Sequence, residues 1–125
     1  MHKQVLRQLK SLSPGCLIEV SWFDASIGKS LVAGEIDIPV KSWGIYLGVL
    51  GDQQKHIILA QNGFRYSDGL WDVDYTAIPL VWSTKIEVIH QGQVSEGEAQ
   101  QLLKSFLQGR RRTLKRRIRN HERSD

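Results

Sequence analysis

The sequence predicts a mainly β fold, in which five short strands form a small, strongly bent barrel flanked by a short N-terminal helix and a long basic C-terminal helix. Three observations support this fold class. Short apolar runs with two-residue alternation recur between turn signals. The triplet Ile78-Pro79-Leu80 breaks the pattern just before the last run, and apolar residues at helical spacing mark both ends of the chain. We expect residues 1–94 to form the N-terminal helix and barrel, and residues 95–125 the C-terminal helix.

The N-terminal helix is expected over residues 3–12, where apolar residues recur at helical spacing until Pro14 ends the pattern. Residues 16–23 read CLIEVSWF and are rich in strand formers, so they predict the first strand. Residues 24–41 mix glycine, proline and charged residues. They predict a long loop with a short extended piece at residues 36–40.

The remaining strands follow from apolar runs separated by turns. Residues 43–50 and 56–61 predict a hairpin with its turn at Gly51-Asp52, at the centre of the sheet. After a second turn at Asp68-Gly69, residues 71–76 alternate apolar and polar side chains and predict a fourth strand. The last strand is expected over residues 84–90.

A capping box, Ser95-Glu96-Gly97-Glu98, predicts that the C-terminal helix begins at about residue 96. Gly109 lies inside this helix, where glycine costs about 1 kcal/mol relative to alanine, and it predicts a bend between a docked half and a basic half. The apolar residues expected to dock on the barrel are Leu102, Leu103, Phe106 and Leu107.

Residues 110–119 read RRRTLKRRIR and are the most informative segment of the chain. On a helix, the apolar residues Leu103, Leu107, Leu114 and Ile118 fall in one stripe. The opposite side holds Arg112, Lys115, Arg116, Arg119 and Arg123. Residues 110–125 hold eight Arg or Lys against two carboxylates, a net charge of +6, whereas residues 1–109 hold nine against eleven, a net charge of −2. A cationic arm on a mildly acidic body predicts electrostatic attachment to an anionic partner.

One part of the predicted barrel resembles a known family. The segment 44–59 contains Gly44, Leu47, Asp52, Lys55, His56 and Ile57-Ile58-Leu59. This pattern is similar to the first motif of the Sm-like family, which belongs with the Src-homology-3-like domains among small barrels. The resemblance implies the barrel fold. The family supports a uridine site with an asparagine where this chain has His56 and a stacking side chain where it has Gln54, so no uridine-site residue is assigned.

The composition and dispersed reactive side chains predict no catalytic activity, no metal and no cofactor. The four histidines show no ligand spacing, and the carboxylates of Asp68, Asp72 and Asp74 are interpreted as a polar strand face. The single cysteine, Cys16, is interpreted as a small buried hydrophobe. The chain shows no apolar run long enough to span a membrane and no signal peptide, so a cytoplasmic location is expected.

We therefore expect a non-enzymatic nucleic-acid-binding protein, with RNA slightly preferred over DNA because of the barrel resemblance. The cationic helix would contact phosphates, while Trp43, Arg65 and Trp71 near strand ends and Lys29 in the long loop would add contacts. Two or more of the four tryptophans are expected to fill the core instead. The basic residues expected in the interface are Arg110, Arg111, Arg112, Lys115, Arg116, Arg117, Arg119 and Arg123.

The alternative from a different class is a protein-interaction or self-assembling β-barrel module. In that case an aromatic groove or sheet edge would receive a peptide or a second copy of the chain, and the basic helix would dock to an acidic partner.

Overall fold

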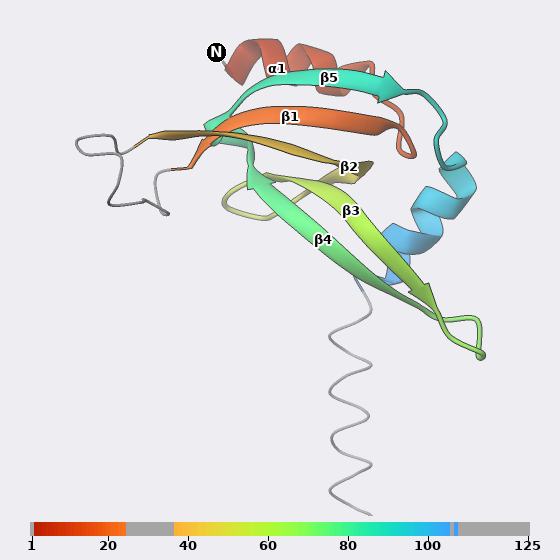
Figure 1. The fold of residues 1–125 in the computed structure, drawn as a ribbon. Helices are drawn as coiled ribbons and strands as arrows, with labels where there is room; N and C mark the ends of the chain where they lie inside the picture. Colours follow the sequence, from red (N-terminus) through yellow and green to blue (C-terminus); the bar gives the residue numbers. More distant parts are fainter. Residues whose placement is uncertain (1, 25–36, 106, 108–125) are drawn as a thin grey trace, which may run out of the picture.

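The computed structural model describes residues 2–24, 37–105 and 107 of the chain (Figure 1). One antiparallel sheet of five strands has the order β4-β3-β2-β1-β5, with the helix α1 lying along β5. A C-terminal helix is described over residues 96–105 and at residue 107. The other elements are α1 (His2–Lys10), β1 (Leu17–Asp24), β2 (Ile38–Leu50), β3 (His56–Arg65), β4 (Trp71–Pro79), the 3-10 turn η1 (Leu80–Trp82) and β5 (Ser83–His90).

These elements confirm the predicted helix, the five strands and both turns, with differences at the strand ends. The extended piece expected at residues 36–40 is confirmed from Ile38 onward, but it is not separate, because Ile38 to Lys41 pair with β1 as part of β2. Residues 25–36 of the predicted loop lie outside the described residues. The first half of β2 has a neighbour on one side only, so Pro39 leaves no ladder bond unmade there. For the same reason β4, an edge strand, continues through Pro79. β3 also runs on to Arg65, past its expected end at residue 61.

The sheet divides at the close contact between Gly44 of β2 and β3. β2 pairs with β3 only from Ile45 onward, and beyond a bulge after Ala60 β3 pairs only with β4. A Cβ atom on Gly44 would lie 2.9 Å from the carbonyl oxygen of Ala60 and 2.9 Å from Cβ of Leu59. Glycine is therefore required where the two strands approach most closely before they separate.

Each face of the sheet has its own apolar core. On one face, α1 contributes Val5 to a cluster with Ile18, Ile57 and Leu59. On the other, the C-terminal helix contributes Ala99 and Leu102 to a cluster with Ile58 and Ala60. The residues of β3 alternate between the clusters, which explains why its run of apolar residues is continuous rather than alternating.

Both helices are held by specific contacts. The side-chain amide of Gln8 donates to the Ile86 carbonyl at 2.7 Å and accepts from the Ile86 amide at 2.9 Å, which ties α1 to β5. The Glu98 amide donates to Ser95 Oγ at 3.2 Å, which confirms the predicted start of the C-terminal helix.

The expected docking of the C-terminal helix is confirmed at Leu102 and Leu103, which pack in the second cluster. It is wrong at Leu107, whose side chain is 56% exposed. Phe106, Gly109 and the basic half of the predicted helix lie outside the described residues.

The described strands confirm a mainly β fold but do not form a closed barrel, because β4 and β5 stand at opposite ends of the strand order and no pairing joins them. No helix within the described ranges is long and apolar enough to cross a membrane.

We predict that Gly44→Ala lowers the free energy of unfolding by about 1–3 kcal/mol, because backbone atoms of β3 leave no room for the methyl group. Denaturant titration of both proteins measures this. Gly97→Ala is the matched control: a Cβ there has no neighbour within 4 Å, so stability should change by less than about 1 kcal/mol. Equal midpoints for the wild type and Gly44→Ala would contradict the steric argument.

Burial raises the pKa of Tyr46 above its ordinary value of 10.0, because the core disfavours the phenolate. The stability linked to this group is fully present below pH 10.0 and is lost as the pH rises through the raised pKa of the folded protein. Unfolding titrations across this alkaline range should therefore show a smaller loss of stability for Tyr46→Phe than for the wild type. A Tyr46→Phe curve that runs parallel to the wild-type curve would refute the linkage.

Candidate nucleic-acid interface

Three of the predicted contact residues belong to the described structure. Each lies in a part of a strand that pairs with another strand on one side only. Trp43 lies in the first half of β2, Arg65 at the end of β3 and Trp71 at the start of β4. Lys29 and the predicted basic residues of the tail lie outside the described residues. These tail residues are Arg110, Arg111, Arg112, Lys115, Arg116, Arg117, Arg119 and Arg123.

Arg65 and Trp71 form a pair across the β3–β4 hairpin. They are opposite each other in the register, and the guanidinium carbon of Arg65 lies 5.8 Å from the centroid of the indole ring, within cation–π range. The Trp71 ring packs partly buried against the cluster that contains Leu102. Gly63 gives the ring its room, since a Cβ there would lie 3.2 Å from Cζ3 of Trp71. Trp71 therefore packs the hairpin onto the C-terminal helix as well as holding Arg65.

The carboxylates of the same hairpin bind neighbouring groups. Tyr66 donates its hydroxyl to Asp72 at 2.6 Å, Asn62 donates to Asp74 at 3.4 Å, and Asp68 accepts from the Leu70 amide at 3.0 Å in the turn. Within the described ranges, no three His, Cys, Asp or Glu side chains gather as a metal-binding group. These carboxylates therefore stabilise the hairpin.

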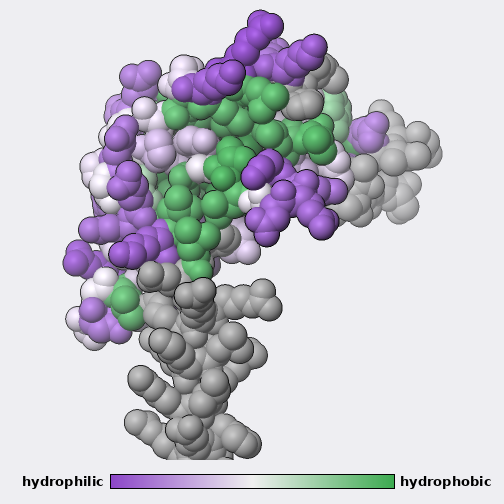
Figure 2. Space-filling model, turned by 180° about the vertical axis from the view of Figure 1, so that it is seen from behind, coloured by the Kyte–Doolittle hydropathy of each residue, from purple (hydrophilic) through white to green (hydrophobic). Residues whose placement is uncertain are grey.

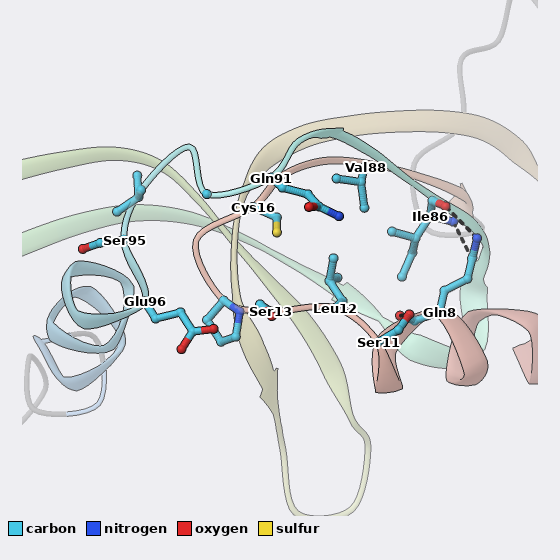
Figure 3. Close-up of a pocket in the computed structure, with 13 residues that line it drawn as sticks. Gln8, Ser11, Leu12, Ser13, Cys16, Ile86, Val88, Gln91, Ser95 and Glu96 are labelled. Atoms are coloured by element: carbon cyan, nitrogen blue, oxygen red, sulfur yellow. Dashed lines mark hydrogen bonds between the residues drawn. The ribbon is translucent and has the colours of Figure 1, made fainter.

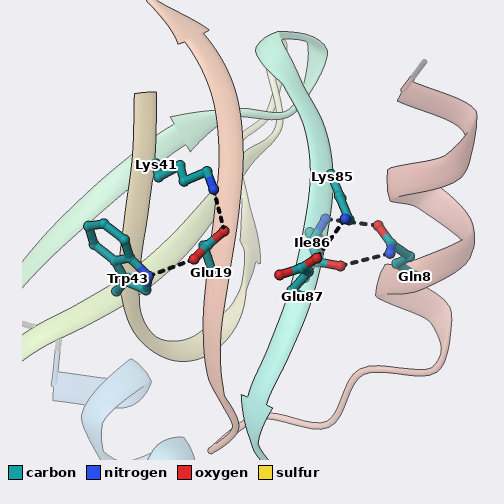
Figure 4. A network of polar contacts seen from close by, with 7 residues as sticks. All are labelled: Gln8, Glu19, Lys41, Trp43, Lys85, Ile86 and Glu87. Carbon is teal, nitrogen blue, oxygen red and sulfur yellow. Dashed lines mark hydrogen bonds and ion pairs between the residues drawn. The ribbon is translucent and has the colours of Figure 1, made fainter. Parts of the chain in front are cut away.

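Trp43 is a half-exposed ring with a fixed orientation. Its side chain is 51% exposed, and its indole N–H donates to Glu19 Oε2 at 2.9 Å from the facing position on β1 (Figure 4). The other oxygen of Glu19 lies 3.5 Å from Lys41 Nζ. The carboxylate is thus held from two sides and restrains the indole ring.

A second ion pair balances the charge on this part of the sheet. Glu19 and Glu87 are direct cross-strand neighbours, an arrangement that is unfavourable for two carboxylates alone. Lys85 lies 2.6 Å from Glu87, and its hydrogen bond and charge lower the pKa of Glu87 while Glu87 raises the pKa of Lys85. With Lys41 beside Glu19, the four charges sum to zero.

A shallow pocket of about 340 Å³ opens beside Trp43, where β2 and β3 separate. Two of its lining residues carry side-chain amides, Gln61 in the β3 bulge and Gln93 in the turn after β5. Neither Arg65 nor Trp71 lines it, so the structure does not bring the three predicted residues to one site. The full lining is Leu17, Trp43, Gly44, Ile45, Ala60, Gln61 and Gln93.

The other two tryptophans pack within the fold. Trp22 and Trp82 stack with their centroids 6.4 Å apart and their planes 12° apart, and the Trp22 indole N–H donates to Ser42 Oγ at 3.0 Å. Trp22 also packs against the cluster beneath α1. This agrees with the expectation that part of the tryptophan set serves the core.

A larger pocket of about 650 Å³ lies between the end of α1, β5 and the start of the C-terminal helix (Figure 3). Cys16 is drawn at its wall, and Gln8, which lines it, is already bonded to Ile86. Glu96 is the one carboxylate among the lining residues, and no Lys or Arg accompanies it. This pocket therefore lacks the cations that a phosphate group requires.

Sequence reasoning missed a basic stripe on α1. Lys3, Arg7 and Lys10 are exposed and recur at the spacing of one helix face, opposite the buried Val5. The signal is present in the sequence, because Lys3, Arg7 and Lys10 follow one another at intervals of four and three residues. Gln61 and Gln93 offered no such signal, because two polar amides distant along the chain carry no pattern.

Hydrophobic residues also reach the surface. Figure 2, the view from behind, shows a continuous region of hydrophobic residues bordered by hydrophilic ones. Contiguous apolar surface of this kind is typical of contact sites for other molecules.

Comparisons with protein-family models, with curated proteins and with solved structures gave no match to this chain.

The structure predicts different costs for removing the two candidate tryptophans. Trp71→Ala should lower the free energy of unfolding by at least about 2 kcal/mol, because the ring packs against the C-terminal helix. Trp43→Ala should cost less than about 1 kcal/mol, because half of its surface already contacts solvent. Chemical denaturation of each variant measures both values. If Trp43→Ala is the more destabilising substitution, the conclusion that Trp71 is the packed ring and Trp43 the surface ring is wrong.

Proposed function

We propose that this protein binds nucleic acid without catalysing a reaction, with single-stranded RNA slightly preferred over DNA. The single observation that carries the proposal is the separation of charge: a net +6 in residues 110–125 against a net −2 in residues 1–109. A dense run of arginine favours phosphate, because the guanidinium group presents several donors in a planar fork. Binding of this kind depends steeply on salt, since each neutralised phosphate releases bound counterions.

The described body supports the proposal with further basic and aromatic groups. Lys3, Arg7 and Lys10 on α1 present three cations to solvent. Leu102 packs in one cluster with Trp71, and Arg110 follows Leu102 by eight positions in the sequence. Covalent connectivity therefore keeps Arg110 within about 30 Å of that leucine. One nucleic-acid strand is long enough to contact both the tail and the Arg65–Trp71 pair.

We propose that the sheet belongs to the small-barrel class that contains the Sm-like and Src-homology-3-like folds. In support, β1 pairs with both β2 and β5, and the break at Ile78-Pro79-Leu80 leads into the turn η1 directly before β5. The bulges and the close approach at Gly44 supply the bending that such a sheet needs.

A second candidate function is a protein-interaction module that binds an acidic partner or a second copy of the chain. The surface region of hydrophobic residues in Figure 2 favours it, as does the outer edge of β4, with which no other described strand pairs.

The salt dependence of binding tests the primary proposal. With the full chain and a labelled single-stranded RNA, Arg116→Gln combined with Arg119→Gln should reduce the slope of log K against log salt by about 1.4, since each phosphate contact on a single strand contributes about 0.7. Adding Arg112→Gln and Arg123→Gln should double that change. Fluorescence anisotropy across a salt series gives the slopes.

A matched control removes two positive charges from the body. Lys55→Gln combined with Lys104→Gln changes exposed lysines in the β2–β3 turn and in the described part of the C-terminal helix and should leave the slope unchanged. Equal slopes for the tail variant and the control would refute a phosphate-binding tail. Absence of wild-type binding to RNA and DNA at low salt would transfer support to the protein-interaction function.

A further inference from the structure

We propose that the pocket beside Trp43 binds one unpaired nucleobase, with the base stacked on the Trp43 ring and its polar edge contacting the amides of Gln61 and Gln93. This inference rests on the proposed nucleic-acid binding. It assigns the recognition of a base to the body of the protein, at a place separate from the phosphate contacts of the tail.

The pocket has a size and position that suit a single flat ring. Its volume of about 340 Å³ is at the lower end of the range for small-molecule sites, about 300–1,000 Å³. It opens where β2 leaves β3, and Gly44 lines it without a side chain because Ala60 and Leu59 exclude one. The constraint that divides the sheet therefore also keeps this space open.

Trp43 supplies a preorganised stacking surface. The indole N–H is bonded to Glu19 at 2.9 Å, and Glu19 is held in turn by Lys41, so rotation of the ring is restrained while half of its surface stays exposed. A ring that is already oriented loses little conformational freedom when a base stacks on it. Stacking is tolerant of sequence, because every base has a π face.

The polar groups of the lining are uncharged. None of the seven lining residues carries a charge, which favours a neutral base over a phosphate. Gln61 donates to Thr76 Oγ1 at 3.2 Å, which orients its amide. Amides both donate and accept, so Gln61 and Gln93 match the mixed donor and acceptor edge of an unpaired base.

The cation on the same strand face as Trp43 is Lys41, which is paired with Glu19 at 3.5 Å. Lys41 precedes Trp43 by two residues on the same strand face, and its side chain is 62% exposed. The base would then occupy the uncharged pocket while its phosphate remains at the surface near Lys41. This separation of groups matches the chemistry of a nucleotide in a single strand.

The test compares the full chain on two oligomers of roughly ten nucleotides, one carrying bases and one abasic with the same phosphate backbone. Trp43→Ala should weaken binding to the base-bearing oligomer about tenfold, which is within the range that loss of one stacked base produces, and leave abasic binding unchanged. Trp43→Phe should retain most of the affinity, because it keeps a ring. Phe64→Ala removes a 54% exposed ring that does not line the pocket and should have no effect.

The outcomes separate this inference from the proposed function. Equal affinity of Trp43→Ala and the wild type for the base-bearing oligomer, with the tail variants still weakened, would overturn the pocket and leave the function standing. Failure of the wild type to bind either oligomer would overturn both. An equal loss on both oligomers for Trp43→Ala would also overturn the pocket, because it would place Trp43 in phosphate binding.

Discussion

The close contact between β2 and β3 at Gly44 is the constraint on which the rest of the structure depends. Because a Cβ atom at this position would lie 2.9 Å from the backbone of Ala60, only glycine lets the strands meet there. Before this point in the chain, β2 pairs with β1 alone. Beyond the bulge after Ala60, β3 pairs with β4 alone. The separation bends the sheet into two parts and opens the pocket beside Trp43. One steric condition thus determines both the shape of the sheet and the candidate base site.

The two helices stabilise this bent sheet by covering opposite faces of it. The first half of β3 is buried on both sides. Ile57 and Leu59 face the cluster that includes α1, and Ile58 and Ala60 face the cluster that includes the C-terminal helix. The C-terminal helix therefore has two roles in the proposed function, since it completes a core and leads the chain toward the basic segment. Positive charge is concentrated in residues 110–125, after the part of the helix that packs on the sheet. The body can therefore present uncharged and aromatic groups. Under the proposed function, phosphate attraction and base contact are assigned to different parts of one small protein.

Much of the fold was predictable from local patterns. Helical spacing located α1, and apolar runs with turn residues located the five strands, because these signals depend on neighbours within a few positions. The ends of strands were less predictable. Pro39 and Pro79 suggested interruptions, yet both lie where a strand has a neighbour on one side only, and only the pairing reveals that. Of the candidate site, Trp43 was identified because a strand was predicted to begin there, although β2 begins earlier, at Ile38. Gln61 and Gln93 became its neighbours only through the fold.

The sequence by itself determined the element types, the mainly β class and the segregation of positive charge into the last sixteen residues, 110–125, because these are properties of composition and short-range periodicity. Tertiary structure decided the role of each tryptophan. Trp22 and Trp82 stack on each other, Trp71 packs in the cluster beneath the C-terminal helix, and Trp43 remains half exposed beside a pocket. Equal side chains acquire different roles because burial depends on which distant strands and helices pack against them, and that information is absent from the local sequence.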